Sequence, residues 1–277
     1  MNAFIPLPAL LAFAAIIGLD CRSTAAVAEE ASAWVRDTHS AVRLLAGSRN
    51  GAVLLGGIEF ELQDGWKTYW RTPGDSGVPP RIDFTKSENV ESVTPLFPAP
   101  TKFPDGAGGV SYGYKKRLVL PLRIVPKSAD KPVTLRVAID YAICERLCLP
   151  VDASLELGFV DAVSAMDGEL AAALNAVPKP TEVGAGSFGI REVKRDGNRV
   201  FVDVEKPQSA HVELFVEGPT PSWSLPEPKP EDHAPAGMAR FAFDLEGMPS
   251  GAKAEGAALK FTLVGHDGAY EYNVNLN

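Results

Sequence analysis

The sequence predicts an all-β protein made of two antiparallel β-sandwich domains that are joined by a short helix and a linker. Three observations predict this class. Most of the chain alternates apolar and polar residues with a period of two, which is typical of half-buried strands. Segments rich in proline and glycine separate these runs and favour turns and loops. One segment between the two sets of strands favours a helix instead.

Residues 1–28 are expected to be a signal peptide that is cleaved near Ala28. An apolar run at about 9–18 is followed by small residues, and the segment Ala-Val-Ala at 26–28 fits an A-x-A cleavage site. The run is shorter than the roughly 20 residues of a membrane-spanning helix, and prolines interrupt it. We therefore expect an exported chain with no membrane span in its mature part.

The first domain is expected at residues 29–160. From Val133 to Cys144 the odd-numbered residues are apolar and would face the core, whereas Arg136 and Asp140 fall on the other face. Further alternating runs occur at 57–62, 117–125 and 154–159, and loops rich in proline and glycine occur at 71–80 and 97–113. Long loops at one end of a sandwich are typical of a functional site.

The second domain is expected at residues 188–277, after a helix and linker at 161–187. Residues 161–177 are rich in Ala, Leu and Glu, which favour a helix, and residues 178–187 begin with prolines and contain glycines, as linkers do. Beyond the linker the alternation resumes, so we predict a smaller sandwich, which contains no cysteine.

The composition excludes one class of partner. Hydrophobic residues make up 45% of the chain and charged residues 22%, as in soluble globular proteins. The formal net charge is −8 at pH 7, whereas a surface that binds nucleic acid or an anionic membrane needs a basic face. We therefore expect no nucleic-acid partner.

The chemistry of the mature chain is expected to centre on its two cysteines, Cys144 and Cys148, in the stretch YAICERLCLP. Exported thiols meet an oxidising compartment, where disulfides persist. On an extended strand their Cα atoms would lie about 13 Å apart, at ~3.3 Å per residue, whereas a disulfide needs them within about 7 Å. A disulfide therefore requires a tight turn at 145–147. Because Cys144 falls on the same phase as Asp140, we expect the pair to be exposed at this turn.

The spacing alone leaves three interpretations open. A structural disulfide that closes so short a loop contributes only about 2 kcal/mol, against more than about 4 kcal/mol for a long loop. An exposed pair suits thiol–disulfide exchange, in which Arg146 would stabilise a thiolate and Glu145 would oppose it. Metal binding is the third, although zinc usually takes four ligands and no further Cys or His lies beside the pair in the sequence. A Cu(I) ion would need only the two thiolates.

Three motifs, in order along the chain, resemble a known family. The segments DGWKTYWRTPGDSGVPP (64–80), SYGYKKRLVLPL (111–122) and IDYAICERLCLPVDASLEL (139–157) are similar to the N-terminal periplasmic domain of the thiol:disulfide interchange protein DsbD. They are closer still to its relative, the suppressor-of-copper-sensitivity protein ScsB. The resemblance covers about residues 35–160 and implies a periplasmic, immunoglobulin-like sandwich. The ScsB-like members carry a second sandwich, which would suit 188–277.

The resemblance also implies a route for electrons. In this family the cysteine pair receives electrons and passes them to periplasmic thioredoxin-fold partners, with no cofactor or metal. Cys148 would form the mixed disulfide with a partner and Cys144 would resolve it. The cysteine spacing here is shorter than in the DsbD domain. Family members continue into a membrane electron-transfer domain, so a separate membrane protein is expected to supply the electrons.

The surround of the predicted site follows from the same resemblance. Trp66 and Tyr69 are similar to the aromatic neighbours of the family's cysteines. Tyr112, together with Gly113, is similar to a cap loop that shields the pair until a partner docks. Arg146 completes the surround because it lies between the cysteines.

The sequence therefore predicts a periplasmic thiol–disulfide exchange protein, a relay like a protein-disulfide reductase, and whether it acts as an enzyme stays open. The alternatives are a non-catalytic protein-binding module with a structural disulfide and a Cu(I)-handling protein. Relatives take part in copper tolerance and in cytochrome c maturation, and the sequence does not choose between these processes.

Overall fold

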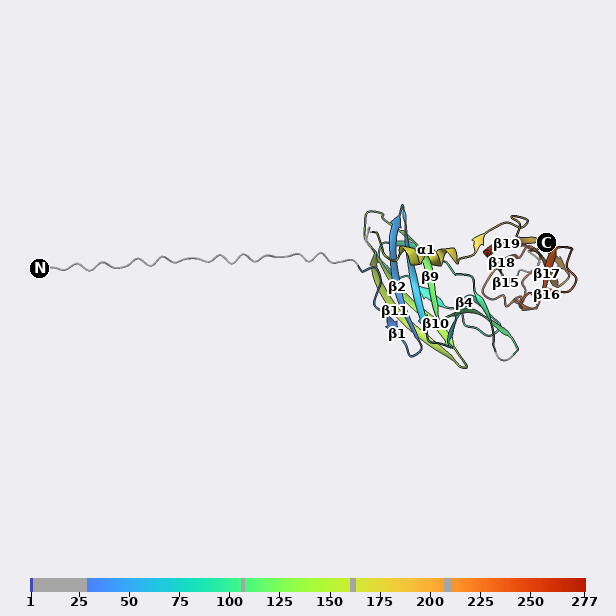
Figure 1. The fold of residues 1–277 in the computed structure, drawn as a ribbon, viewed down its shortest axis with the longest axis horizontal. Coiled ribbons are helices and arrows are strands. Elements are labelled where there is room, and N and C mark those ends of the chain that lie inside the picture. The colour runs from blue at the N-terminus through green and yellow to red at the C-terminus, as the bar shows by residue number, and fades with distance from the viewer. Residues whose placement is uncertain (2–28, 106–107, 160–162, 207–210) are drawn as a thin grey trace.

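The computed structural model describes Met1 and residues 29–105, 108–159, 163–206 and 211–277. Within these residues the chain forms β-strands, one α-helix and one short 3₁₀ helix, η1 (Leu245–Gly247). The strands build two sandwiches, as Figure 1 shows, so the predicted all-β class is confirmed. The predicted signal peptide and its cleavage site near Ala28 lie outside the described residues. No helix in the described part of the chain is long and apolar enough to cross a membrane.

The first sandwich consists of two antiparallel sheets. One sheet has the order β1 (Val35–Arg36), β2 (Ser40–Asn50), β3 (Val53–Leu62), β9 (Arg117–Pro126) and β6 (Val90–Pro95). The other has the order β11 (Cys148–Phe159), β10 (Val133–Cys144), β4 (Lys67–Gly74), β8 (Val110–Lys115) and β7 (Thr101–Pro104), and β5 (Arg81–Asp83) also pairs with β10. The placement of β4 between β10 and β8 brings segments far apart in the sequence together at one end of this sheet.

Apolar side chains from both sheets fill one core. Leu44 and Ile58 of the first sheet and Trp70 and Leu135 of the second are all fully buried in this core. Along β10, the odd-numbered residues from 133 to 143 are each at most 4% exposed. The period-two alternation therefore predicted the core face of this strand correctly.

The helix α1 (Asp167–Asn175) is shorter than the predicted 161–177, of which residues 161–162 are not described. It covers the outer face of the first sheet, where Leu170 is fully buried against Leu45 and Val119. Gly47 and Gly57 leave room for this leucine, because a Cβ atom at either position would lie 2.7 Å from a Leu170 methyl group. The helix therefore belongs to the packing of the first sandwich and is more than a connection.

The second sandwich also has two sheets. Their orders are β12 (Lys179–Pro180), β19 (Gly268–Asn275), β18 (Ala258–Gly265) and β15 (Glu213–Glu217), and β13 (Gly189–Asp196), β14 (Arg199–Glu205), β17 (Met238–Asp244) and β16 (Lys229–Glu231). Strand β12 lies in the segment predicted as a linker and pairs in parallel with β19. Val202, Leu214 and Phe261 form part of a core shared by both sheets.

The two sandwiches touch each other through β4, which lies on the side of the first sandwich that faces the second (Figure 1). Phe215 of β15 is fully buried and belongs to the core of the first sandwich. Its ring packs against Trp70 of β4 and Tyr112 of β8, with ring centroids 5.7 and 4.9 Å apart. The sequence pattern gave no indication of this contact.

Candidate functional site

The two cysteines flank the turn of the hairpin formed by β10 and β11. The register pairs every residue of β10 with one of β11, and Cys144 opposite Cys148 is the last pair before the turn. Within the turn at 145–147, the Glu145 amide donates a hydrogen bond to the Leu147 carbonyl at 3.3 Å. The cysteine Cα atoms are 4.2 Å apart and the sulfurs form a disulfide. The predicted tight turn is confirmed.

The two cysteines differ in exposure. Cys148 is exposed, as predicted, but Cys144 is only 2% exposed, so the prediction was wrong for this residue. Cys144 does lie off the main core, in a small separate cluster with Tyr69 and Ala142. The alternation identified its face of the strand correctly, but it carried no information on the ring from β4 that covers this face. An external thiol therefore meets Cys148 first.

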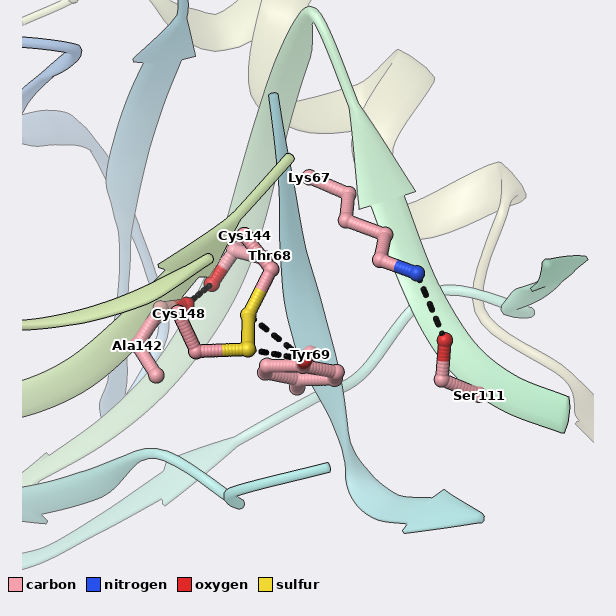
Figure 2. The surroundings of a disulfide bond; sticks show 7 residues. All are labelled: Lys67, Thr68, Tyr69, Ser111, Ala142, Cys144 and Cys148. Atoms are coloured by element: carbon pink, nitrogen blue, oxygen red, sulfur yellow. Dashed lines mark hydrogen bonds between the residues drawn. A yellow bond between two sulfur atoms is a disulfide. The ribbon is translucent and has the colours of Figure 1, made fainter. Parts of the chain in front are cut away.

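Tyr69 is the side chain that lies against both sulfurs (Figure 2). Its hydroxyl donates a hydrogen bond to Cys144 Sγ at 2.8 Å and lies 3.3 Å from Cys148 Sγ. Burial raises the pKa of Tyr69, so the hydroxyl stays protonated at neutral pH and remains a donor. A donor in this place would stabilise a thiolate that forms when the disulfide opens, because hydrogen bonds to charged acceptors are the stronger ones.

The pairing of β4 with its neighbours fixes the position of Tyr69. Thr68 pairs with Ile143, and its hydroxyl donates to the Ala142 carbonyl at 3.0 Å. On the other side, Gly113 of β8 pairs with Tyr69. A Cβ atom at Gly113 would lie 1.9 Å from the Thr68 carbonyl oxygen, so the close approach of β8 to β4 requires glycine here.

A loop covers the Tyr69 ring. Gly77 lies so near that a Cβ atom there would be 2.7 Å from Tyr69 Cδ1. Gly77 and Thr68 were not among the predicted site residues. Their place beside Tyr69 depends on the order of the strands, and local sequence patterns do not contain this order. Lys67 pairs with Cys144 but points away from the sulfurs, and its ammonium group donates to Ser111 Oγ at 2.9 Å (Figure 2). Burial, with the charge of Lys115, lowers the pKa of Lys67.

The other predicted site residues have different surroundings. Trp66 precedes β4 and stacks on His39, with ring centroids 4.1 Å apart. Arg146 is exposed in the turn between the cysteines. Tyr112 lies on the core face of β8, against Trp70, and therefore on the opposite face of the sheet from the sulfurs. The prediction placed Tyr112 over the cysteines as part of a cap, and this position was wrong.

Metal coordination has few possible ligands at this site. In the described part of the chain, no group of three or more His, Cys, Asp or Glu side chains is arranged to hold a metal ion. A metal bound at the hairpin would have the two cysteines as its ligands, and only after reduction of the disulfide.

Comparison with known proteins agrees with this geometry. Residues 40–159 match the family model described as "Thiol:disulfide interchange protein DsbD, N-terminal". The crystal structure of the N-terminal periplasmic domain of ScsB from Proteus mirabilis is similar over 90% of this chain and 98% of that chain, with 23% sequence identity and a TM-score of 0.71. The likeness therefore extends over both sandwiches.

Other structural likenesses are much weaker. The yeast GGA1 GAE domain matches 44% of this chain and 94% of its own, with 8% identity and a TM-score of 0.27. A conserved domain protein from Bacillus anthracis matches 86% of this chain and 77% of its own, with 11% identity and a TM-score of 0.24. No curated protein shows significant sequence similarity to the chain.

The family match, the similar fold and the disulfide beside the hairpin turn together fit a thiol–disulfide exchange module. Within this chain, the similarity to DsbD N-terminal domains covers residues 40–159, which form most of the first sandwich.

Proposed function

We propose that this protein exchanges disulfides in the periplasm, where Cys144 and Cys148 relay electrons from a membrane reductant to thioredoxin-fold partners. The observation that carries the proposal is the asymmetry of the pair: one cysteine is exposed, while the other is buried under the Tyr69 hydroxyl. The family description and the periplasmic ScsB domain support the compartment and the chemistry. Whether the pathway serves copper tolerance or cytochrome c maturation depends on the partner.

Each half of the cycle is a thiol–disulfide exchange. The thiolate of Cys148 attacks a sulfur of the partner's disulfide, a mixed disulfide forms, and the partner's second sulfur leaves as a thiolate and takes up a proton. The thiolate of Cys144 then attacks Cys148 Sγ, and the partner's first sulfur leaves. The partner has gained two electrons and two protons, and the Cys144–Cys148 disulfide is restored.

Reduction by the membrane donor reverses this order. A donor thiolate attacks the exposed Cys148, and the buried Cys144 leaves as a thiolate, directly against the hydroxyl of Tyr69. A second donor thiol then releases Cys148. The Tyr69 hydroxyl therefore donates to Cys144 Sγ in both half-reactions: when this thiolate attacks Cys148, and when it leaves Cys148.

Trapping tests the proposal with a purified thioredoxin whose resolving cysteine is replaced by serine and whose remaining cysteine is linked by a disulfide to thionitrobenzoate. A thiolate that attacks this probe displaces the thionitrobenzoate anion and leaves a mixed disulfide with thioredoxin. We expect Cys144→Ala to accumulate a mixed disulfide with this probe, visible on non-reducing gels and mapped to Cys148 by peptide mass spectrometry. The matched variant, Cys148→Ala, should accumulate little, because its remaining thiol is buried. The reverse result would exchange the two roles, and no adduct with either variant would contradict exchange.

A second candidate is a protein-binding module with a permanent disulfide, which the burial of Cys144 favours. The reduction potential separates the two candidates, because structural disulfides in secreted proteins typically lie below about −300 mV and labile ones lie higher. A value above this range supports the relay.

A further inference from the structure

Strand β4 contacts the disulfide and the second sandwich through consecutive residues. Tyr69 touches both sulfurs. The next three residues all meet the second sandwich: Trp70 packs on Phe215, and Arg71 and Thr72 bind Glu217. The residues of β4 that contact the second sandwich therefore follow Tyr69 by one to three positions.

The polar part of this contact is a compact, half-buried charge cluster. The Arg71 guanidinium donates from Nε and Nη2 to the two carboxylate oxygens of Glu217 at 2.9 and 2.6 Å, and from Nη2 to Glu271 at 2.7 Å. The Thr72 hydroxyl donates to Glu217 at 2.6 Å. Side-chain exposures of 24%, 12% and 17% for Arg71, Glu217 and Glu271 show that water screens these charges only in part.

The charge balance of the cluster holds Arg71 firmly in its ionised form. Burial by itself lowers the pKa of Arg71, but the hydrogen bonds and charges of Glu217, followed by those of Glu271, raise it overall. A bidentate pair between arginine and a carboxylate also fixes the relative orientation of its two partners. Two strands of the second sandwich, β15 and β19, are thereby tied to a single residue of β4.

The apolar part of the contact adds a second restraint on β4 beside Arg71, whose guanidinium lies 4.7 Å from the centroid of the Trp70 ring. Phe215 enters the core of the first sandwich between Trp70 and Tyr112. Lys102 of β7 lies over the Phe215 ring at 5.3 Å and donates to Glu227 at 2.7 Å. Because interiors are closely packed, this inserted ring leaves Trp70 little freedom to shift.

We propose that the second sandwich positions Tyr69 beneath the disulfide by holding β4 through Arg71, so that Glu217 is a positioning residue for exchange. The inference rests on the proposed function. A hydrogen bond weakens steeply as its angle departs from linearity, so a small movement of β4 would weaken the 2.8 Å contact with Cys144. A loosened contact would stabilise the departing thiolate less and slow the opening of the disulfide.

A double-mutant cycle tests this positioning role. The readout is the rate at which dithiothreitol reduces the disulfide in wild type, Glu217→Gln, Tyr69→Phe and the double variant, followed by alkylation and mass spectrometry. We expect Glu217→Gln to slow reduction about threefold to fivefold in the wild-type background. In the Tyr69→Phe background it should change the rate less than about 1.5-fold, because no hydroxyl remains to be positioned.

A matched control uses an ion pair of similar geometry away from β4. Arg240 donates to both carboxylate oxygens of Asp203 at 2.6 and 2.7 Å, within one sheet of the second sandwich. Asp203→Asn should leave the rate unchanged. An equal effect of Asp203→Asn and Glu217→Gln would overturn the proposal, as would a full-size effect of Glu217→Gln in the absence of the Tyr69 hydroxyl.

Two arrangements keep the test decisive. If Glu217→Gln fails to fold by circular dichroism, Glu271→Gln takes its place under the same criteria. It removes the charge that Arg71 meets at Glu271 and also the Lys260–Glu271 ion pair, at 3.1 Å, within the second sandwich. Dithiothreitol replaces the partner, so the cycle is independent of trapping with thioredoxin. If Glu217→Gln and Tyr69→Phe are coupled as expected but no adduct with thioredoxin forms, the proposed function alone is refuted. If adducts form but the effects of the two substitutions are additive, only the positioning role is refuted.

Discussion

Replacing Tyr69 with phenylalanine removes one hydroxyl group and keeps the ring that covers Cys144. The hydroxyl is the group within 2.8 Å of the buried sulfur, and at 4% exposure the tyrosine has little access to water that would substitute for it. We expect the variant to fold normally and to open its disulfide more slowly. The reason is that Cys144 leaves as a thiolate, which then lacks its donor.

The size of the effect follows from the charge on the sulfur. A hydrogen bond to a charged group contributes about 1.5–3 kcal/mol. In the transition state only part of the charge has reached the leaving sulfur, so about 1.4 kcal/mol, or a tenfold slower reduction, is expected. At a pH where Cys144 is ionised the full hydrogen bond counts, and the reduction potential should fall by roughly 30–65 mV for this two-electron couple.

The assay is reduction by excess dithiothreitol, quenched by alkylation and counted by mass. Tyr141→Phe is the matched control: this tyrosine is also 4% exposed and loses a 2.8 Å hydrogen bond to Ser40, but it lies on the core face of β10. The control should react like wild type. A Tyr69→Phe rate within twofold of both would refute the argument that the hydroxyl stabilises the leaving sulfur.

Two further predictions concern stability. Gly113→Ala should lower the free energy of unfolding, measured in urea, by at least about 1–3 kcal/mol, because its Cβ would overlap the Thr68 carbonyl. The control Gly158→Ala, whose Cβ would have nothing within 4 Å, should change this free energy little. Equal losses for the two variants would contradict the overlap argument. Burial raises the pKa of Tyr112 and Tyr114, so both stay neutral in the folded chain while the unfolded chain ionises near pH 10. The stability these residues contribute should be fully present below about pH 10 and lost above it. In urea titrations between pH 8 and 11, Tyr112→Phe should make the free energy of unfolding fall less steeply with pH. An unchanged slope would exclude Tyr112 as a cause of the loss.

Strand faces were predictable from the sequence, because alternation is a local property. The odd-numbered residues of β10 are in the core as expected, and the turn between the cysteines followed from the reach of an extended chain. The resemblance also identified Tyr69 as a neighbour of the pair, and the structure places its hydroxyl on both sulfurs.

The contacts of the site residues with other strands were not predictable in this way. They depend on which strands are neighbours in the sheets, and the pattern within a short segment does not contain this information. Cys144 is buried by the ring of Tyr69, which lies on another strand and 75 residues earlier in the sequence. Tyr112 faces the core because its phase on β8 puts it beside Trp70. Phe215 looks like an ordinary core residue of its own strand, yet it packs in the other sandwich.

The cysteines form the last pair of the β10–β11 hairpin, and the backbone pairing that joins the two strands runs along their whole length. This pairing does not depend on the sulfur–sulfur bond. Breaking the sulfur–sulfur bond therefore removes little from the fold, and we expect the oxidised and reduced proteins to share nearly one shape. A protein of this kind presents the same surface to its donor and to its acceptor. The direction in which electrons move is then decided by the potentials of those two molecules and requires no change of shape in the carrier.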